Sequence, residues 1–181
     1  NVKTIEKELK AEYRNGTYFV YYRRRPNEGQ QPTTIWTDAK YSATEHGTAL
    51  IKNLFGTDEV FSYPKSIHAT TDCLVAMGIA DNSGAIILDF FAGSGTTGHA
   101  VINLNREDGG RRKFILVEMG DYFDTVLVPR LKKVTFTPEW KDGKPKRMPT
   151  KEEIERSPRI MKILRLESYE DTLNNLELKR T

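Results

Sequence analysis

The sequence lacks the features that mark secreted and membrane-spanning proteins. It contains a single cysteine, Cys73, so no disulfide bond can form within the chain, and we expect a reducing cytoplasm. No run of about eighteen apolar residues occurs, so we expect no membrane span, and we see no charged-then-apolar leader of the secretory kind. The three histidines, His46, His68 and His99, are scattered along the chain, and we therefore predict no metal site.

Neither sign of charge dominates the composition. The chain carries 28 Lys and Arg against 25 Asp and Glu, a formal net charge of +3. This balance is compatible with nucleic-acid binding but does not argue for it, because most surface charge is simply solvated. The hydrophobic content of 38% suits one domain of mixed type with a small appendage. The first residue is Asn1 rather than Met, so we expect the chain to be a piece of a longer polypeptide.

The middle of the chain has the most regular pattern. Residues 85–90 form a nearly continuous apolar run, as expected of a strand buried on both faces. A glycine-rich turn follows, then a predicted helix over residues 96–105, a second apolar strand over 113–118 and a helix over 122–133. This βαβα order predicts an α/β fold, a parallel sheet with helices on both faces. Two further helices are predicted upstream, over residues 45–56 and 66–77.

The flanking segments are less regular. Residues 1–14 predict a short amphipathic helix, and residues 17–25 predict a strand. Residues 137–150 are rich in lysine and proline and predict a linker, before a strand over 160–166 and a helix over 169–178. We therefore divide the chain into an N-terminal region (1–44), a central part (45–136), and a linker with a C-terminal strand and helix (137–181).

The junction between the first apolar strand and its helix carries the main functional pattern. The strand ends at Asp89, Gly93 and Gly95 follow in a tight turn, and the helix begins near Thr96. A ligand at the carboxyl end of a parallel strand must approach the backbone closely, and glycine leaves that room. The free N–H groups of the helix N-terminus suit a phosphate or a carboxylate. Glu118, at the end of the second strand, is placed to accept both hydrogens of a ribose diol, so the pattern favours a nucleoside ligand.

The glycine pattern narrows the choice of ligand. No G-K-[S/T] sequence occurs, which excludes a Walker phosphate cradle. We interpret the turn as G-S-G, without the third glycine of the dinucleotide fingerprint, which argues against a nicotinamide cofactor. A nucleoside that carries a carboxylate and no pyrophosphate describes S-adenosyl-L-methionine. The alternative is an ordinary turn with a solvated glutamate, since an isolated G-x-G is a weak pattern.

The segment D-F-F-A-G-S-G-T-T, residues 89–97, resembles the cofactor motif of amino-methylating (N6-adenine) DNA methyltransferases. The longer segment 88–118 resembles the modification subunits of type III restriction-modification systems. Three upstream elements agree with this resemblance: W-T-D at residues 36–38, a helix ending in L-F-G at residues 47–56, and F-S-Y-P-K-S at residues 61–66. The resemblance extends over residues 33–135.

The resemblance implies a partial Rossmann-like, S-adenosyl-L-methionine-dependent methyltransferase fold in a bacterial cytoplasmic protein. It implies that Glu118 binds the ribose hydroxyls and that Met119 packs against adenine. Lys65 is implied to lie near the methionine carboxylate, with Ser66 beside it in the same cofactor-side element. The loop around the methionine portion is implied to comprise Asp89, Phe91, Ala92, Gly93, Ser94, Gly95, Thr96 and Thr97.

The catalytic signature of that family, Asp or Asn followed by Pro-Pro and an aromatic residue, is absent, because no Pro-Pro pair occurs. In this group the signature precedes the cofactor motif, so we expect it upstream of Asn1 and expect no methylation by this chain alone. The implied partners are double-stranded DNA, the upstream half of the polypeptide and a restriction subunit, and an unpaired strand edge favours a homo-oligomer. Arg23, Arg24 and Arg25 follow an aromatic strand and are candidates for DNA contact, or else a solvated strand end.

Three other functions stay open at this stage. The missing catalytic motif favours a non-catalytic module derived from a methyltransferase, which binds the cofactor or a partner. The cofactor loop alone is equally compatible with methylation of a protein or an RNA. A nicotinamide-dependent oxidoreductase is the third, and the glycine pattern as we interpret it argues against that function.

Overall fold

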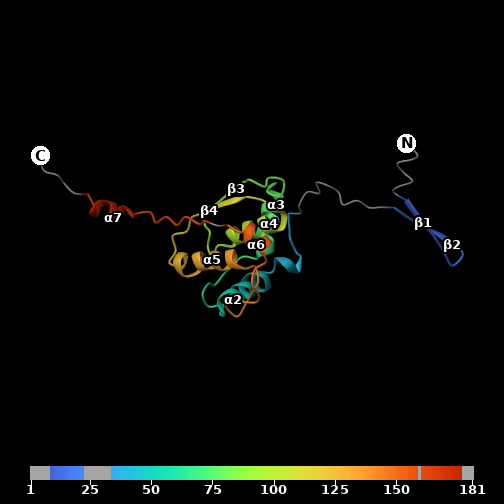
Figure 1. Ribbon diagram of the computed structural model, residues 1–181, viewed down its shortest axis with the longest axis horizontal. Helices are drawn as coiled ribbons and strands as arrows, with labels where there is room; N and C mark the ends of the chain where they lie inside the picture. The colour runs from blue at the N-terminus through green and yellow to red at the C-terminus, as the bar shows by residue number, and fades with distance from the viewer. Residues whose placement is uncertain (1–8, 23–33, 159, 177–181) are drawn as a thin grey trace. The chain divides into compact units, whose positions relative to one another are not determined.

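The computed structural model describes residues 9–22, 34–158 and 160–176, shown in Figure 1 as coloured ribbon. The chain divides into two compact units, Asn1–Ile35 and Trp36–Thr181.

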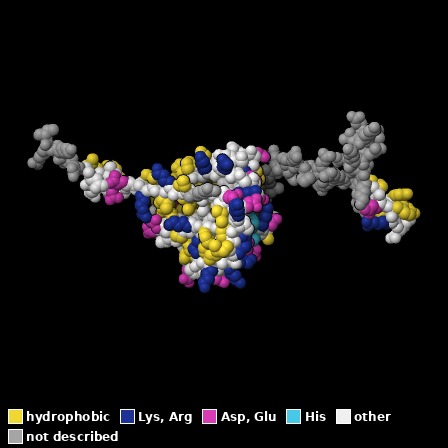
Figure 2. All heavy atoms as spheres, in the orientation of Figure 1, with side chains coloured by type: hydrophobic (Ala, Val, Ile, Leu, Met, Phe, Trp, Pro, Cys, Tyr) yellow, Lys and Arg dark blue, Asp and Glu magenta, His cyan; other side chains and the backbone are white. Residues whose placement is uncertain are grey.

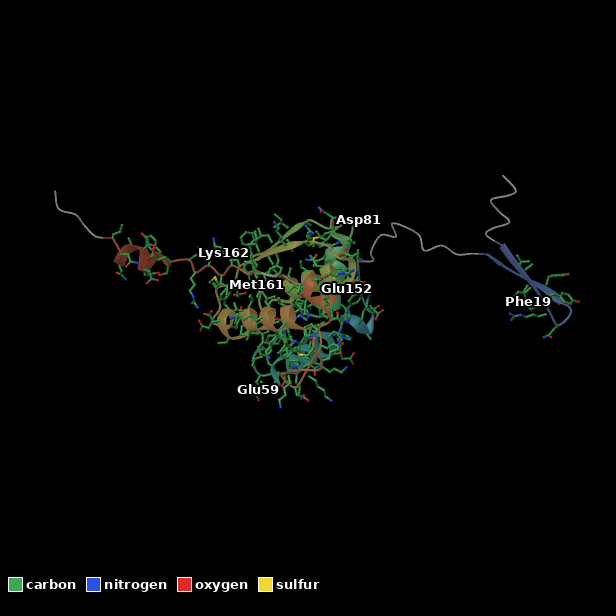
Figure 3. All side chains as sticks on the ribbon, in the orientation of Figure 1. Phe19, Glu59, Asp81, Glu152, Met161 and Lys162 are labelled. Atoms are coloured by element: carbon green, nitrogen blue, oxygen red, sulfur yellow. The ribbon has the colours of Figure 1, made fainter. Side chains whose placement is uncertain are left out.

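The first unit contains an antiparallel hairpin of β1 (Leu9–Arg14) and β2 (Thr17–Tyr22). Asn15 and Gly16 form its two-residue turn with φ values of 51° and 80°, as a type I′ turn requires. Tyr13 and Tyr18 lie opposite each other, with ring centroids 4.8 Å apart, and Phe19 is also partly exposed (Figure 3). The helix predicted over residues 1–14 is therefore wrong for residues 9–14, while the strand is confirmed for residues 17–22. Arg23, Arg24 and Arg25 lie outside the described residues.

The predicted βαβα unit is present in the second unit. β3 (Ile86–Asp89) leads through the glycine-rich loop into α4 (Thr96–Asp108), and β4 (Lys113–Leu116) returns parallel to β3. A π-helical turn, η3 (Phe123–Leu127), continues into α5 (Val128–Phe136). Leucine, valine and isoleucine side chains of α4 and α5 meet in the core, so the helices are held by their apolar faces.

The two helices predicted upstream are confirmed. The π-helical turn η2 (Thr44–Thr48) continues into α2 (Ala49–Phe55), which ends at Gly56 in the left-handed conformation, φ 84°. A short 3-10 helix, η1 (Ala39–Tyr41), precedes them. α3 (Ile67–Ala76) begins at Ser66, whose hydroxyl accepts a hydrogen bond from the N–H of Ala69 and caps the helix.

The parallel sheet is buried on one face only. Ile87, Phe114 and Leu116 pack against α3, α4 and α5, which Figure 1 shows on one side of β3 and β4. On the opposite face Ile86, Leu88 and Ile115 are half-exposed or more. The predictions of strands buried on both faces and of helices on both faces are therefore wrong for the described residues. Of the expected Rossmann-like sheet, the described residues contain one parallel strand pair, β3 and β4.

The segment after α5 is folded rather than a linker. Two short strands, β5 (Trp140–Lys141) and β6 (Lys144–Pro145), form a hairpin, and Trp140 packs against the core and donates its indole N–H to the carbonyls of Lys133 and Thr137. α6 (Lys151–Glu155) follows. Aromatic packing and helix capping thus override the polar, proline-rich composition that predicts a linker.

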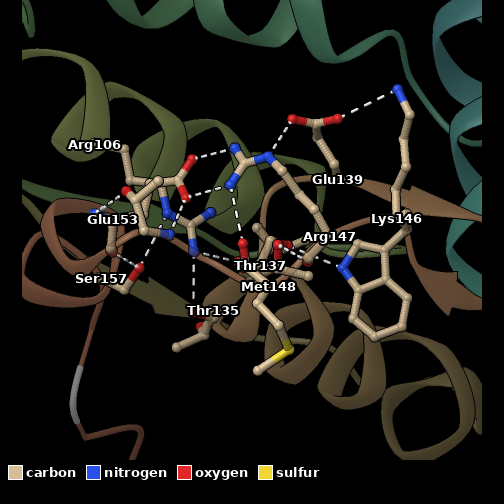
Figure 4. Close-up of polar contacts among 12 residues, drawn as sticks. Arg106, Thr135, Thr137, Glu139, Lys146, Arg147, Met148, Glu153 and Ser157 are labelled. Carbon is tan, nitrogen blue, oxygen red and sulfur yellow. Dashed lines mark hydrogen bonds and ion pairs between the residues drawn. The ribbon is translucent and has the colours of Figure 1, made fainter.

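A polar network fastens this segment to the ends of α4 and α5 (Figure 4). Arg147 binds both oxygens of Glu153 at 2.6 and 2.8 Å and one oxygen of Glu139 at 2.7 Å. Arg106 donates to the carbonyls of Val134 and Thr135 at the C-terminus of α5 and to the hydroxyl of Ser157. Cationic side chains at helix C-termini satisfy the last carbonyls. This network therefore caps the C-terminus of α5 and attaches the α6 segment to it.

The remaining described residues, 160–176, carry one more helix, α7 (Tyr169–Asn174), capped by Ser168. The helix predicted over residues 169–178 is confirmed for 169–174, and residues 177–178 lie outside the described residues. No strand forms over residues 160–166, although Met161 (Figure 3) packs against the core. None of the described helices is long and apolar enough to span a membrane.

Candidate functional site

Asp89 fixes the start of the loop that joins β3 to α4. Its Oδ1 accepts a hydrogen bond from the N–H of Phe91 at 3.0 Å, and its Oδ2 accepts one from the hydroxyl of Thr97 at 2.6 Å. Asp89 therefore ties the end of the strand to the first turn of the helix. Its two oxygens, and the hydroxyl of Thr97, are engaged within the protein.

The two glycines of the turn adopt conformations that favour glycine. Gly93 has φ 55° and Gly95 has φ 82°, and Gly95 stands at the N-cap position of α4. Left-handed backbone is costly for residues with a Cβ atom. Gly95 also packs closely, since a Cβ there would lie 3.3 Å from a Leu127 carbon atom. The loop therefore holds the first N–H groups of α4 in one place.

Gly98 completes a G-x-G-x-x-G spacing with Gly93 and Gly95. A Cβ atom on Gly98 would lie 2.8 Å from Leu131 Cδ2 and 2.9 Å from Leu116 Cδ1. This is the close helix–strand packing that the third glycine of the dinucleotide fingerprint permits. The interpretation of the turn as G-S-G without a third glycine is wrong, so the glycine count is no argument against a dinucleotide.

Glu118 lies directly after β4 and closes the loop from the other strand. Its Oε2 accepts from the N–H of Gly93 at 2.8 Å, and its Oε1 accepts from the N–H groups of Met119 and Gly120, each at 2.9 Å. Partial burial alone would raise the pKa of Glu118, but these hydrogen bonds and one from Tyr122 lower it below its ordinary value. The carboxylate is thus held ionised and fixed against the glycine loop.

Two aromatic residues at this site are missed by the sequence analysis. Phe61 lies 3.6 Å from the position of a Cβ on Gly93 and stacks edge-on with Tyr122, with ring centroids 5.0 Å apart. The hydroxyl of Tyr122 hydrogen-bonds to Glu118, which raises the pKa of Tyr122. Phe61 belongs to the F-S-Y-P-K-S element, so that motif could have identified it. Tyr122 comes to lie beside Phe61 only through the fold.

The loop side chains point in different directions. Ala92, Ser94 and Thr96 are buried, whereas Phe91 is 89% exposed and Met119, beyond Glu118, is 98% exposed. Beneath the loop lies the fully buried Arg130 of α5, which donates to the hydroxyls of Ser94 and Thr96. Arg130 is also absent from the predicted site. It occupies the core-facing position between Leu127, Leu131 and Val134, and this spacing could have identified it.

Lys65 and Ser66 take different roles in the structure. Ser66 is buried, caps α3 and donates its hydroxyl to the carbonyl of Lys40 at 2.9 Å. Lys65 is exposed. The backbone of Pro64 and Lys65 packs against η2, because a Cβ on Gly47 would lie 2.4 Å from the carbonyl oxygen of Pro64. Among the residues that the structure describes, no group of three or more His, Cys, Asp or Glu side chains is placed to hold a metal ion.

Comparison with known proteins identifies the class. A family profile described as DNA methylase, for N6- and N4-methyltransferases, matches residues 2–127. This is well over half of the chain, and the chain therefore belongs to the N6/N4 DNA methylase family.

Its relatives include modification enzymes of restriction systems. The chain is 43% identical over 103 residues to the EcoPI Mod subunit, a type III restriction-modification enzyme of Escherichia phage P1, covering 55% of this chain and 15% of that protein. It is 46% identical over 90 residues to the StyLTI Mod subunit of Salmonella typhimurium, covering 50% and 13%. It is 40% identical over 105 residues to the type II methyltransferase M.KpnI of Klebsiella pneumoniae, covering 58% and 24%. The matched segment thus spans less than a quarter of the length of each of these relatives.

Proposed function

We propose that this chain forms the S-adenosyl-L-methionine-binding part of a site-specific DNA adenine N6-methyltransferase. The observation that carries the proposal is the direct hydrogen bond between Glu118, at the end of β4, and Gly93 in the loop after β3. This hydrogen bond joins two groups that suit the two ends of the cofactor. The ionised carboxylate of Glu118 suits a ribose diol, and the glycine loop at the helix N-terminus suits the carboxylate of the ligand. Membership of the DNA methylase family supports this ligand over a dinucleotide.

The residues around the loop fit the parts of such a cofactor. The N–H groups of Met119 and Gly120 use both lone pairs of Glu118 Oε1, whereas the N–H of Gly93 uses one lone pair of Oε2. A ribose hydroxyl would therefore bind Oε2 or take the place of the Tyr122 hydroxyl. The exposed Phe91 and Met119 offer apolar surface for a purine. Gly93 and Gly95 allow a ligand to approach the backbone before α4. Lys65, as the sequence resemblance implies, would supply a cation for the methionine carboxylate.

The bound cofactor would supply an electrophilic methyl group, and the target is the exocyclic amine of an adenine turned out of the DNA duplex. In this chain the contribution to the reaction is binding and orientation: Glu118 fixes the nucleoside end and the loop of residues 93–96 fixes the other. The Asp-Pro-Pro-aromatic motif that holds the base is proposed to come from the upstream half of the polypeptide. By analogy with the Mod subunits, double-stranded DNA and a restriction subunit are the proposed partners.

Calorimetric titration of the chain with S-adenosylhomocysteine tests the proposal. We expect binding, and we expect Glu118→Ala to weaken it by about tenfold or more, because a hydrogen-bonded charged partner of the ribose is removed. The matched control is Glu155→Ala, an exposed glutamate on α6, which should bind like the wild type. Equal affinities of wild type and Glu118→Ala would refute the assignment of Glu118, and absence of binding by the wild type would refute cofactor binding by this chain.

A further inference from the structure

Arg130 is a buried cation with no anionic partner among the described residues. Its side chain is fully buried in α5, and desolvation lowers its pKa to about 9. One of its nitrogens, Nε, has no hydrogen-bond partner in the described structure. Burying an unpaired charge is expensive, and an apolar side chain of similar volume would fill the same space at lower cost. The guanidinium therefore serves more than packing.

The other nitrogens of Arg130 converge on the glycine loop. Nη1 donates to the Ser94 hydroxyl at 2.8 Å, to the Thr96 hydroxyl at 2.9 Å and to the Ser94 carbonyl at 3.3 Å. These acceptors flank Gly95, the N-cap residue of α4. One planar group thus fixes the two residues on either side of a left-handed glycine, and it does so from the buried side of the loop.

His99, one turn along α4, completes the arrangement. Its Nδ1 lies 3.3 Å from Arg130 Nη2. Since arginine has only donors, Nδ1 must accept, so the imidazole is neutral and carries its proton on Nε2. Burial, and secondarily the charges of Arg130 and Arg106, lower the pKa of His99 well below its ordinary value, in agreement with that protonation state. The site therefore keeps a single positive charge beneath the loop.

We infer that Arg130 is a positioning residue, which holds residues 93–96 so that the N-terminal N–H groups of α4 meet the carboxylate end of the cofactor. The inference rests on the proposed function. The exposed Lys65 is free to move in solvent, whereas the guanidinium of Arg130 is fixed and shielded from water. A fixed positive charge behind the loop stabilises an anion in front of the loop more strongly than a solvated positive charge does.

Two ligands separate this role from a merely structural one. S-adenosylhomocysteine carries the amino-acid carboxylate, and 5′-methylthioadenosine shares the nucleoside but lacks that end. We expect Arg130→Met to weaken S-adenosylhomocysteine by about tenfold and methylthioadenosine by no more than about twofold. Arg130→Lys, which keeps the charge but not the planar fork, should fall between wild type and Arg130→Met. Glu118→Ala, in contrast, should weaken both ligands.

Hydrogen exchange provides a test that needs no ligand. Arg130→Met should speed amide exchange in the peptide that contains residues 90–98 and leave α2 unchanged. If Arg130→Met does not fold, the double variant Ser94→Ala/Thr96→Val removes the hydroxyl acceptors while the arginine stays, and it should give the same pattern. Equal weakening of both ligands, or unchanged loop exchange, would overturn the inference. If the wild type binds neither ligand, the proposed function fails, and the exchange result alone decides whether Arg130 holds the loop.

Discussion

At the scale of single residues, Gly47 has almost no room for a side chain. A Cβ atom there would lie 2.4 Å from the backbone oxygen of Pro64 and 3.2 Å from that of Lys65. Because both contacts are with backbone, neither neighbour can rotate away. We expect Gly47→Ala to lower the free energy of unfolding by about 2 kcal/mol or more, measured as a lower urea midpoint.

Gly84 provides the matched control for Gly47. A Cβ there would meet only Asn82 Oδ1, at 4.0 Å, and the residue lies in an exposed turn before β3. Gly84→Ala should leave the urea midpoint within about 0.5 kcal/mol of the wild type. If the two substitutions cost the same, the packing of the Pro64 segment on η2 does not limit stability.

The candidate site was predictable from sequence only where its residues belong to a local motif. The strand–turn–helix order places Gly93 and Gly95 before α4, and a parallel neighbour brings Glu118 to the same edge, so this pair could be anticipated. The helical spacing places Arg130 on the core-facing side of α5, but it does not predict that the guanidinium turns toward the loop, and only the fold brings Tyr122, before η3, to Glu118. Which loop side chains turn inward, such as Ser94, is likewise decided by the packing of α5.

At the scale of elements, the network around Arg147 predicts how the C-terminal segment responds to acid. Hydrogen bonds from Arg147, then from the Thr150 backbone, lower the pKa of Glu153 from 4.5 to about 2. A carboxyl whose pKa is lower in the folded state contributes stability above its unfolded pKa and loses that contribution as the pH falls through its folded pKa. We therefore expect Glu153→Gln to lower the urea midpoint at pH 7, with a gap from the wild type that closes between pH 4.5 and about 2.

Glu155 lies on the same helix, α6, and is exposed. Glu155→Gln should follow the wild type across this pH range, since the effect depends on the Arg147 contact and not on helix charge. A gap between wild type and Glu153→Gln that stays constant from pH 7 to pH 2 would show that the substitution acts through packing instead of through the ion pair.

Element prediction succeeded where apolar periodicity is strong and failed where one turn decides the structure. The βαβα unit has long apolar runs, and its four elements are confirmed. Residues 1–14 have helix-like apolar spacing, yet Asn15-Gly16 turns residues 9–14 back onto β2, and that dipeptide is a hairpin signal in its own right. For residues 137–150, Trp140 packs into a core that composition alone could not reveal.

At the scale of the whole molecule, the sheet has an unusual surface for a parallel pair. Ile86, Leu88 and Ile115 lie on the face of β3 and β4 that the described helices leave open. Figure 2 shows apolar side chains reaching the surface where Figure 1 places these strands. Parallel sheets are normally covered on both faces, and unpaired strand edges favour association. We propose that the upstream half of the polypeptide covers this face.

In the absence of that half, this face should drive self-association of the chain. We expect a sedimentation coefficient that rises with protein concentration, and we expect Ile115→Lys to reduce the rise, because a charge at the centre of the open face opposes its burial. Ile154→Lys is the matched control: Ile154 is 54% exposed on α6, close to the 52% of Ile115, and its replacement should leave association unchanged. Equal effects of the two lysines would assign association to general surface hydrophobicity, and a monomer at all concentrations would show that the open face does not associate.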